Sequence, residues 1–167
     1  MTQAQKTEYI DKLVTIGYFW LSEENYTCPY SIYELLSNLK LNKKEKDRVE
    51  GLKTDTITMG KEKFSTNEIE KINIPNPCNT DEKKLLWITL MTLMNLFNSG
   101  NFEMGYMFLM EFTETWKEVY INIIPLIQGS EFKDEIINWA MTHFFFAKDI
   151  TNKESFELYG YKIKKII

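Results

Sequence analysis

The most apolar stretch of the chain covers residues 85–112, with the sequence LLWITLMTLMNLFNSGNFEMGYMFLMEF. The turn-forming residues NSGN at 98–101 divide it, and Gly100 suits the left-handed position that follows a helix. The half before this turn is shorter than the roughly 18–20 residues that cross a bilayer. Glu103 and Glu111 place charge in the other half. The pattern therefore predicts an αα-hairpin and no membrane span.

The first helix of this hairpin is predicted to open at a capping box formed by Asn79 and Glu82. Its only polar stripe consists of Thr89, Thr92 and Asn95, so we expect it to be buried nearly all round and central in the fold. The large side chains predicted to lie in the core are Trp87, Phe108, Trp116 and Trp139.

The second helix, about residues 102–124, is predicted to be amphipathic. At about 100° per residue, one face collects Gly105, Phe108, Leu109, Phe112, Trp116, Val119 and Ile123. The other face, called here the acidic face, consists of Glu103, Met107, Met110, Glu111, Glu114 and Glu118. Exposed methionines are flexible and polarisable, and among carboxylates they indicate a docking surface for a partner with basic and apolar character. The alternative is that another helix covers them, or that they are simply exposed.

Further helices are predicted before this hairpin. Apolar residues at helical spacing predict a helix over about residues 3–24. Capping boxes predict a helix opening at Ser31 with Glu34, and a short helix opening at Asn42 with Glu45.

The segments after these helices are less regular. Residues 54–66, TDTITMGKEKFST, form two short extended runs around a glycine and predict a β-hairpin. Ser65 and Glu68 predict one more turn of helix. Residues 73–79 are rich in turn formers and predict a linker. A last helix is predicted over residues 131–148, and the C-terminal segment is predicted to be short and either helical or extended.

These elements predict a mainly α-helical bundle with a central αα-hairpin, and with a small β-hairpin in the N-terminal half. The predicted division is an N-terminal helical subdomain over residues 1–74, a helical bundle core over residues 79–160 and a basic tail over residues 161–167. One continuous domain is the alternative.

Charge is unevenly distributed along the chain, and one segment is basic. The net charge is −4, with 14 acidic and 7 basic residues between residues 64 and 160, but 8 basic and 5 acidic residues between residues 40 and 63. The order of elements over residues 31–64 is that of a winged helix-turn-helix. The candidate nucleic-acid-binding residues are Lys43, Lys44, Lys46, Arg48, Lys61 and Lys63. Lys40 replaces the usual turn glycine, and acidic residues interrupt the basic face, which favours a solvated helix instead.

Candidate catalytic chemistry is sparse. His143 is the only histidine and lies on a predicted apolar face, where a buried packing role is favoured. Cys28 and Cys78 form no CxxC pair, so neither a zinc site nor a redox motif is predicted. Glu111, Glu114 and Glu118 lack the histidines of a carboxylate metal site. No catalytic residue, metal or cofactor is therefore predicted, and the protein is not expected to be an enzyme.

The residue usage also bears on origin and location. Arg48 is the only arginine, and alanine is rare, as AT-rich codon usage would produce. The first residues, MTQAQKTEYIDK, lack the apolar core of a signal peptide, and the two isolated cysteines suit a reduced compartment, so a cytoplasmic location is predicted.

The favoured functional prediction is a non-enzymatic protein-binding module, of the inhibitor, immunity-protein or accessory kind, which docks a basic protein on the acidic face. The alternative is a winged-helix-like DNA-binding regulator with a helical dimer or partner domain. Nucleic acid is the less favoured partner, and the pattern leaves the oligomeric state open.

Overall fold

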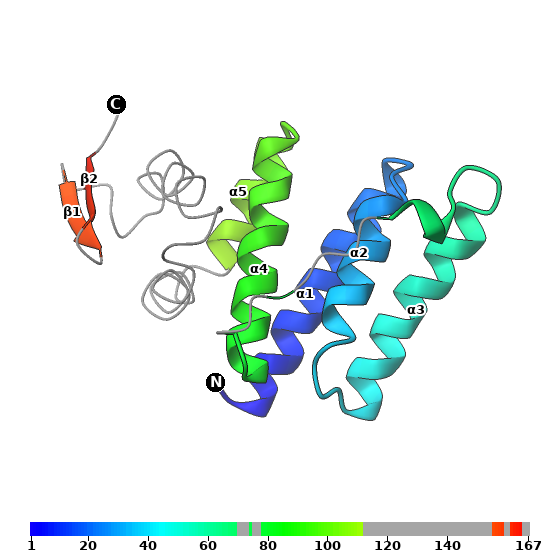
Figure 1. The fold of residues 1–167 in the computed structure, drawn as a ribbon, viewed down its shortest axis with the longest axis horizontal. Helices are drawn as coiled ribbons and strands as arrows, with labels where there is room; N and C mark the ends of the chain where they lie inside the picture. The colour runs from blue at the N-terminus through cyan, green and yellow to red at the C-terminus, as the bar shows by residue number, and fades with distance from the viewer. Residues whose placement is uncertain (70–73, 75–77, 112–154, 159–160, 165–167) are drawn as a thin grey trace. The chain divides into compact units, whose positions relative to one another are not determined.

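A computed structural model describes the chain except for residues 70–73, 75–77, 112–154, 159–160 and 165–167 (Figure 1). The described residues are mainly helical, as predicted. By its internal packing the chain divides into Met1–Thr92 and Leu93–Ile167. The predicted limits at residues 1–74 and 79–160 stay a prediction.

Three helices pack against one another in the first unit: α1 (Gln3–Ser22), α2 (Thr27–Leu36) and α3 (Lys43–Met59) (Figure 1). The predicted N-terminal helix is thus confirmed. The core side chains that are at most 1% exposed in these helices are Ile10, Leu13, Val14, Ile16, Leu36, Val49 and Leu52. Gly17 allows α1 and α3 to approach closely, because a Cβ at this position would lie 2.7 Å from Leu52 Cδ2.

The start of α2 differs from the prediction. The helix begins at Thr27, and Ser31 lies inside it rather than at its cap. The Asn25 side chain instead accepts a hydrogen bond from the Cys28 backbone N–H at 3.0 Å. Pro29 falls in the first turn, where its missing N–H would have had no helical partner. The proline therefore belongs to the helix that it was expected to precede.

The capping box at the start of α3 is confirmed, with Asn42 and Glu45 bonded reciprocally. The predicted β-hairpin at residues 54–66 is wrong, because α3 continues to Met59 and is not a short helix. Thr56 is fully buried in it, and its hydroxyl donates to the Leu52 carbonyl. The β-branched residues of this segment are therefore held in a helix by burial of one face, which overrides their strand propensity.

The chain after α3 is anchored by aromatic contacts to α2. The Phe64 ring lies 6.3 Å from that of Tyr26 and 5.7 Å from that of Tyr30. The short 3₁₀ helix η1 (Thr66–Glu68) follows, and the Ser65 hydroxyl accepts from the Asn67 N–H, as the predicted cap requires.

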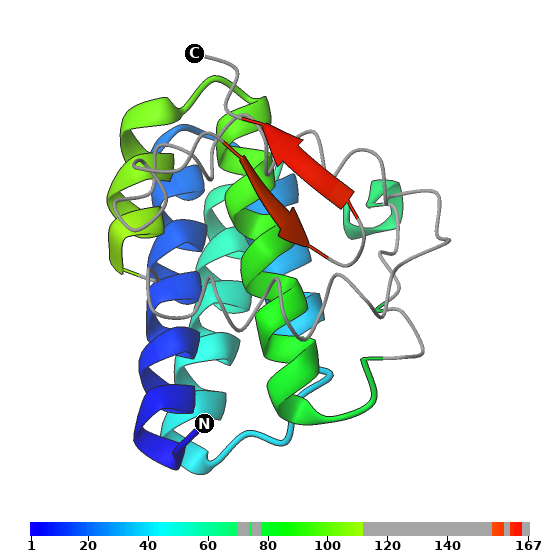
Figure 2. The ribbon, with the colours of Figure 1, turned by 90° about the vertical axis from the view of Figure 1, so that its left-hand side faces the viewer.

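The helix α4 (Asp81–Asn98) is confirmed as nearly buried all round. Its described side chains that are 6% exposed or less include Leu85, Leu86, Trp87, Ile88, Thr89, Leu90, Thr92, Leu93, Met94 and Leu96. Its cap lies one residue later than predicted, because the Thr80 hydroxyl, not Asn79, accepts from the Lys83 N–H. Figures 1 and 2 show that α1, α3 and α4 all begin at the same end of the first unit.

The turn after α4 is the predicted one. Gly100 has φ +84°, and the Asn101 N–H donates to the Leu96 carbonyl at 2.9 Å. This bond satisfies one of the free carbonyls at the helix end. Helix α5 (Phe102–Glu111) follows directly after this turn.

The described C-terminal residues are extended. Strand β1 (Ser155–Leu158) pairs antiparallel with β2 (Tyr161–Lys164), with Phe156 opposite Ile163, and Figure 2 shows both as arrows. Of the two conformations predicted for this segment, the extended one is correct.

Candidate functional site

The acidic face of α5 is partly described. Gly105 and Phe108 are buried, and Phe108 is only 3% exposed. Glu103 and Met107 are exposed and lie one helical turn apart on another side, with Met107 exposed to 46%. The predicted division between a core side and an exposed side is confirmed for these four residues.

The side chains of the remaining members of the acidic face lie outside the described residues. Met110 and Glu111 belong to α5, but their side chains lie outside the description. Glu114, Glu118 and the predicted helix over residues 131–148 lie outside the described residues, as do Trp116, Trp139 and His143. The predicted core positions of Trp87 and Phe108 are confirmed, at 3% exposed each.

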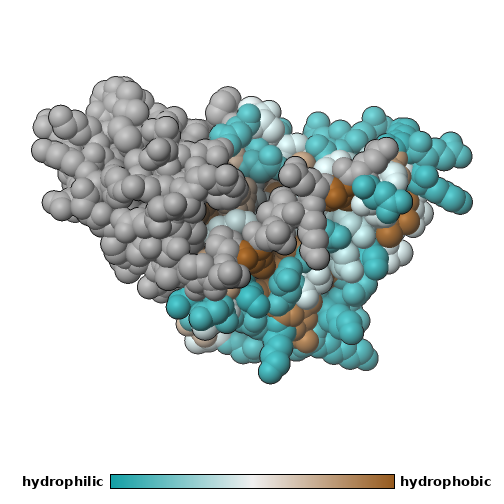
Figure 3. All heavy atoms as spheres, in the orientation of Figure 1, coloured by the Kyte–Doolittle hydropathy of each residue, from teal (hydrophilic) through white to brown (hydrophobic). Residues whose placement is uncertain are grey.

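Met107 is one of a few large apolar residues that are exposed in the described part of the chain. The large apolar residues found exposed in the described part of the chain are Met1, Ile57, Met59 and Met107. Figure 3 shows small apolar patches scattered over the mostly hydrophilic surface of the described residues. Met107 follows the exposed carboxylate Glu103 by one helical turn, as Met59 follows the exposed Asp55, whereas Ile57 follows Lys53.

The six candidate nucleic-acid-binding residues are all exposed, but they do not form the predicted arrangement. Lys61 and Lys63 lie in the turn after α3 and not on a wing, because no strand pair exists there. The side chain of Lys63 lies 3.8 Å from Glu24. Arg48 Nε lies 3.3 Å from Asp11 Oδ1, so part of its charge is offset by α1.

The buried member of this region is Glu45, which is 1% exposed. Its Oε1 accepts from the Asn42 N–H, and its Oε2 accepts from Gln3 Nε2 at 3.1 Å and from the Thr7 hydroxyl at 2.9 Å. The capping pattern predicted the first bond only. The other two bonds tie the first turn of α3 to the first turns of α1.

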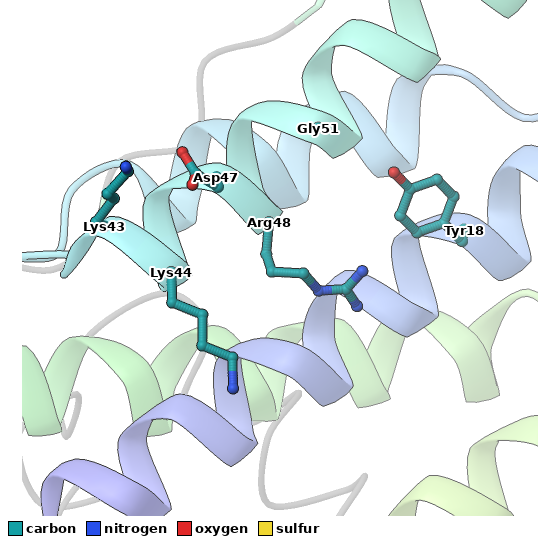
Figure 4. A pocket seen from close by; sticks show the side chains of 6 residues that line it. All are labelled: Tyr18, Lys43, Lys44, Asp47, Arg48 and Gly51. Carbon is teal, nitrogen blue, oxygen red and sulfur yellow. The ribbon is translucent and has the colours of Figure 1, made fainter.

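A groove lies between α1 and α3, with a volume of about 550 Å³ (Figure 4). Its lining residues are Tyr18, Lys43, Lys44, Asp47, Arg48 and Gly51. The Tyr18 hydroxyl donates a hydrogen bond to the Asp55 carboxylate. Burial of the ring, followed by this bond, raises the pKa of Tyr18 to about 12. Sequence reasoning found the cations but missed Tyr18 and Gly51; the glycine inside a predicted helix was the available signal.

The cysteines do not form a reactive pair. Neither cysteine is in a disulfide bond, Cys28 is half-buried, and Cys78 is 2% exposed. Burial raises the pKa of the Cys78 thiol. Within the described residues, no three His, Cys, Asp or Glu side chains come together as metal ligands.

No helix in the described part of the chain combines the length and apolar character needed to cross a membrane. Comparison with protein-family models, curated proteins and solved structures finds no match for this chain.

Proposed function

We propose that this chain is a non-enzymatic module that binds a basic protein through the acidic face of α5 and the residues that follow it. The observation that carries the proposal is the exposure of Met107, 46%, on a helix whose Phe108 is 3% exposed. The helix thus has one buried side and leaves an apolar side chain in water beside the Glu103 carboxylate.

The physical mechanism has two parts. Carboxylates raise the rate of encounter with a positively charged partner and disfavour acidic ones. A methionine that loses its water at the contact adds apolar burial, and its flexible side chain adapts to the partner surface. Steering by charge and anchoring by Met107 together give a surface selective for a basic protein with an apolar spot.

The biological role we propose is that of an inhibitor, immunity-like or accessory protein. Net charge of −4 on a chain of 167 residues suits the masking of a basic surface on a toxin, nuclease or similar target. This step rests on analogy of charge and size.

The test compares two methionines. The tagged protein, its Met107→Glu variant and its Met59→Glu variant are used at low salt to capture proteins from the native cell extract. Met59 is the matched control, since it is exposed to 54% on α3, in the other unit. We expect a basic protein to be retained by the natural chain and by Met59→Glu, lost with Met107→Glu, and released as salt screens the carboxylates.

Two outcomes would contradict the proposal. Equal capture by the Met107→Glu variant would remove Met107 from the interface. A lowered thermal midpoint for Met107→Glu, with Met59→Glu unchanged, would identify Met107 as a packing residue.

DNA binding is the second candidate. It is supported by the exposure of Lys43, Lys44 and Lys46 on the first turns of α3, the second helix of a two-helix pair. Phosphate-driven binding weakens steeply with ionic strength. Replacing Lys43, Lys44 and Arg48 by alanine should abolish any salt-sensitive retention of DNA, and unchanged retention would exclude this helix as the recognition element.

A further inference from the structure

Gly51 lacks the structural reasons that explain other glycines of the chain. A Cβ at Gly17 would meet Leu52 at 2.7 Å, one at Gly60 would meet Tyr26 at 2.9 Å, and Gly100 has φ +84°. A Cβ at Gly51 would meet only the Tyr18 hydroxyl oxygen, at the ordinary contact distance of 3.8 Å. Glycine inside a helix is destabilising relative to alanine. Neither close packing nor backbone conformation requires it at position 51.

Because Gly51 has no side chain, the groove between α1 and α3 stays open at this position. Gly51 lies between Arg48 and Tyr18 along this groove (Figure 4). Any larger side chain on this face of α3 would project toward the Tyr18 hydroxyl. The groove volume of about 550 Å³ falls within the range of roughly 300–1,000 Å³ typical of small-molecule sites.

The lining carries an excess of positive charge. The lining holds three cationic side chains, Lys43, Lys44 and Arg48, and one carboxylate, Asp47. Among the described residues, Lys43 and Lys44 have no ion-pair partner, and Arg48 engages Asp11 through Nε, with no described acceptor for its two terminal nitrogens. A guanidinium with free parallel N–H groups suits a carboxylate or a phosphate.

We propose that this groove binds a small aromatic anion, in which an apolar ring lies over Gly51 against Tyr18 and a phosphate or carboxylate group contacts Arg48 and Lys44. This site lies within Met1–Thr92 and is independent of the protein-binding surface proposed for α5. The neutral Tyr18 phenol supports it. A phenol is protonated at neutral pH, so the ring itself brings no negative charge against the anion.

The test uses the full chain, labelled with ¹⁵N, and four probes. Phenyl phosphate and benzoate carry both the ring and the anion, inorganic phosphate carries only the anion, and benzyl alcohol carries only the ring. We expect saturable shifts of the Gly51 amide with phenyl phosphate or benzoate, at least tenfold tighter than with either partial probe, while the Gly60 amide stays in place. The stronger of the first two probes identifies the anionic group. Absence of a Gly51 shift with both would overturn the site.

Two pairs of variants locate the binding. Gly51→Leu fills the groove, while Thr58→Leu adds the same side chain at an exposed position about two turns further along α3, outside the groove. Arg48→Gln removes the guanidinium, and Lys46→Gln removes an exposed charge from α3 outside the groove. We expect Gly51→Leu and Arg48→Gln to raise the dissociation constant at least tenfold, and the two controls to change it less than twofold. Equal effects of test and control variants would overturn the proposal.

Discussion

The hydroxyl of Thr7 on α1 donates a 2.9 Å hydrogen bond to Glu45 Oε2 on α3. The two residues join the starts of two parallel helices through a carboxylate that is 1% exposed. Gln3 and Asn42 supply two more donors to the same carboxylate. A buried carboxylate is tolerated when its oxygens are satisfied in this way.

We therefore expect Glu45→Ala to lower the free energy of unfolding by about 2–4 kcal/mol, because it removes a buried side chain and the acceptor of three part-buried hydrogen bonds. Glu50→Ala is the matched control, since Glu50 is an exposed glutamate of the same helix and should change stability by less than about 0.5 kcal/mol. Urea unfolding of both variants measures the difference. Equal values would show that the three hydrogen bonds contribute no net stability.

The features that could be predicted from the sequence are those set by neighbouring residues. The Asn42 capping box, the Gly100 turn and the opposite exposures of Met107 and Phe108 all follow from spacing along a few turns. Each of these patterns has a local physical cause, either an orphan N–H group, a positive φ or a helical periodicity. The prediction of the acidic face belongs to this class.

The features that escaped prediction depend on distant packing. Residues 54–59 are rich in β-branched side chains and favour a strand, but burial of Thr56 within α3 keeps them helical. The groove pairs Tyr18 of α1 with Gly51 of α3, and no spacing rule relates two residues on different helices. Tertiary contacts decide in both cases, and they outweigh local propensity.

Gly51→Ala is expected to stabilise the protein by about 0.5–1 kcal/mol, because alanine restricts the unfolded chain and its methyl group meets only an ordinary contact. Gly17→Ala is expected to destabilise it by about 1–3 kcal/mol, because its Cβ would overlap Leu52. Thermal or urea unfolding of the two variants should therefore give opposite signs. A loss of stability in Gly51→Ala would show that position 51 needs glycine for packing and would remove the reason to assign it a ligand.

The two cysteines are expected to differ in reactivity toward a disulfide reagent such as DTNB. Cys28 is half-buried, whereas Cys78 is 2% exposed and has a pKa raised by burial, so its thiolate is both scarce and shielded. The folded protein should show one fast and one slow thiol, and Cys28→Ser should remove the fast phase. Loss of the fast phase in Cys78→Ser instead would contradict the burial of Cys78.

Tyr18 should make stability depend on pH at the alkaline end. Burial and the hydrogen bond to Asp55 raise its pKa in the folded chain from 10.0 to about 12. Below pH 10 the phenol is protonated in both states, and its hydrogen bond contributes fully to stability. As pH rises from 10 to about 12, the unfolded chain releases the proton while the folded chain retains it, so ionisation favours unfolding.

The stability advantage of the natural chain over Tyr18→Phe should therefore be larger at about pH 9 than at about pH 11 in urea unfolding. Because the other titrating groups are common to both proteins, parallel pH profiles would show that the Tyr18 pKa is the same in the folded and unfolded chains.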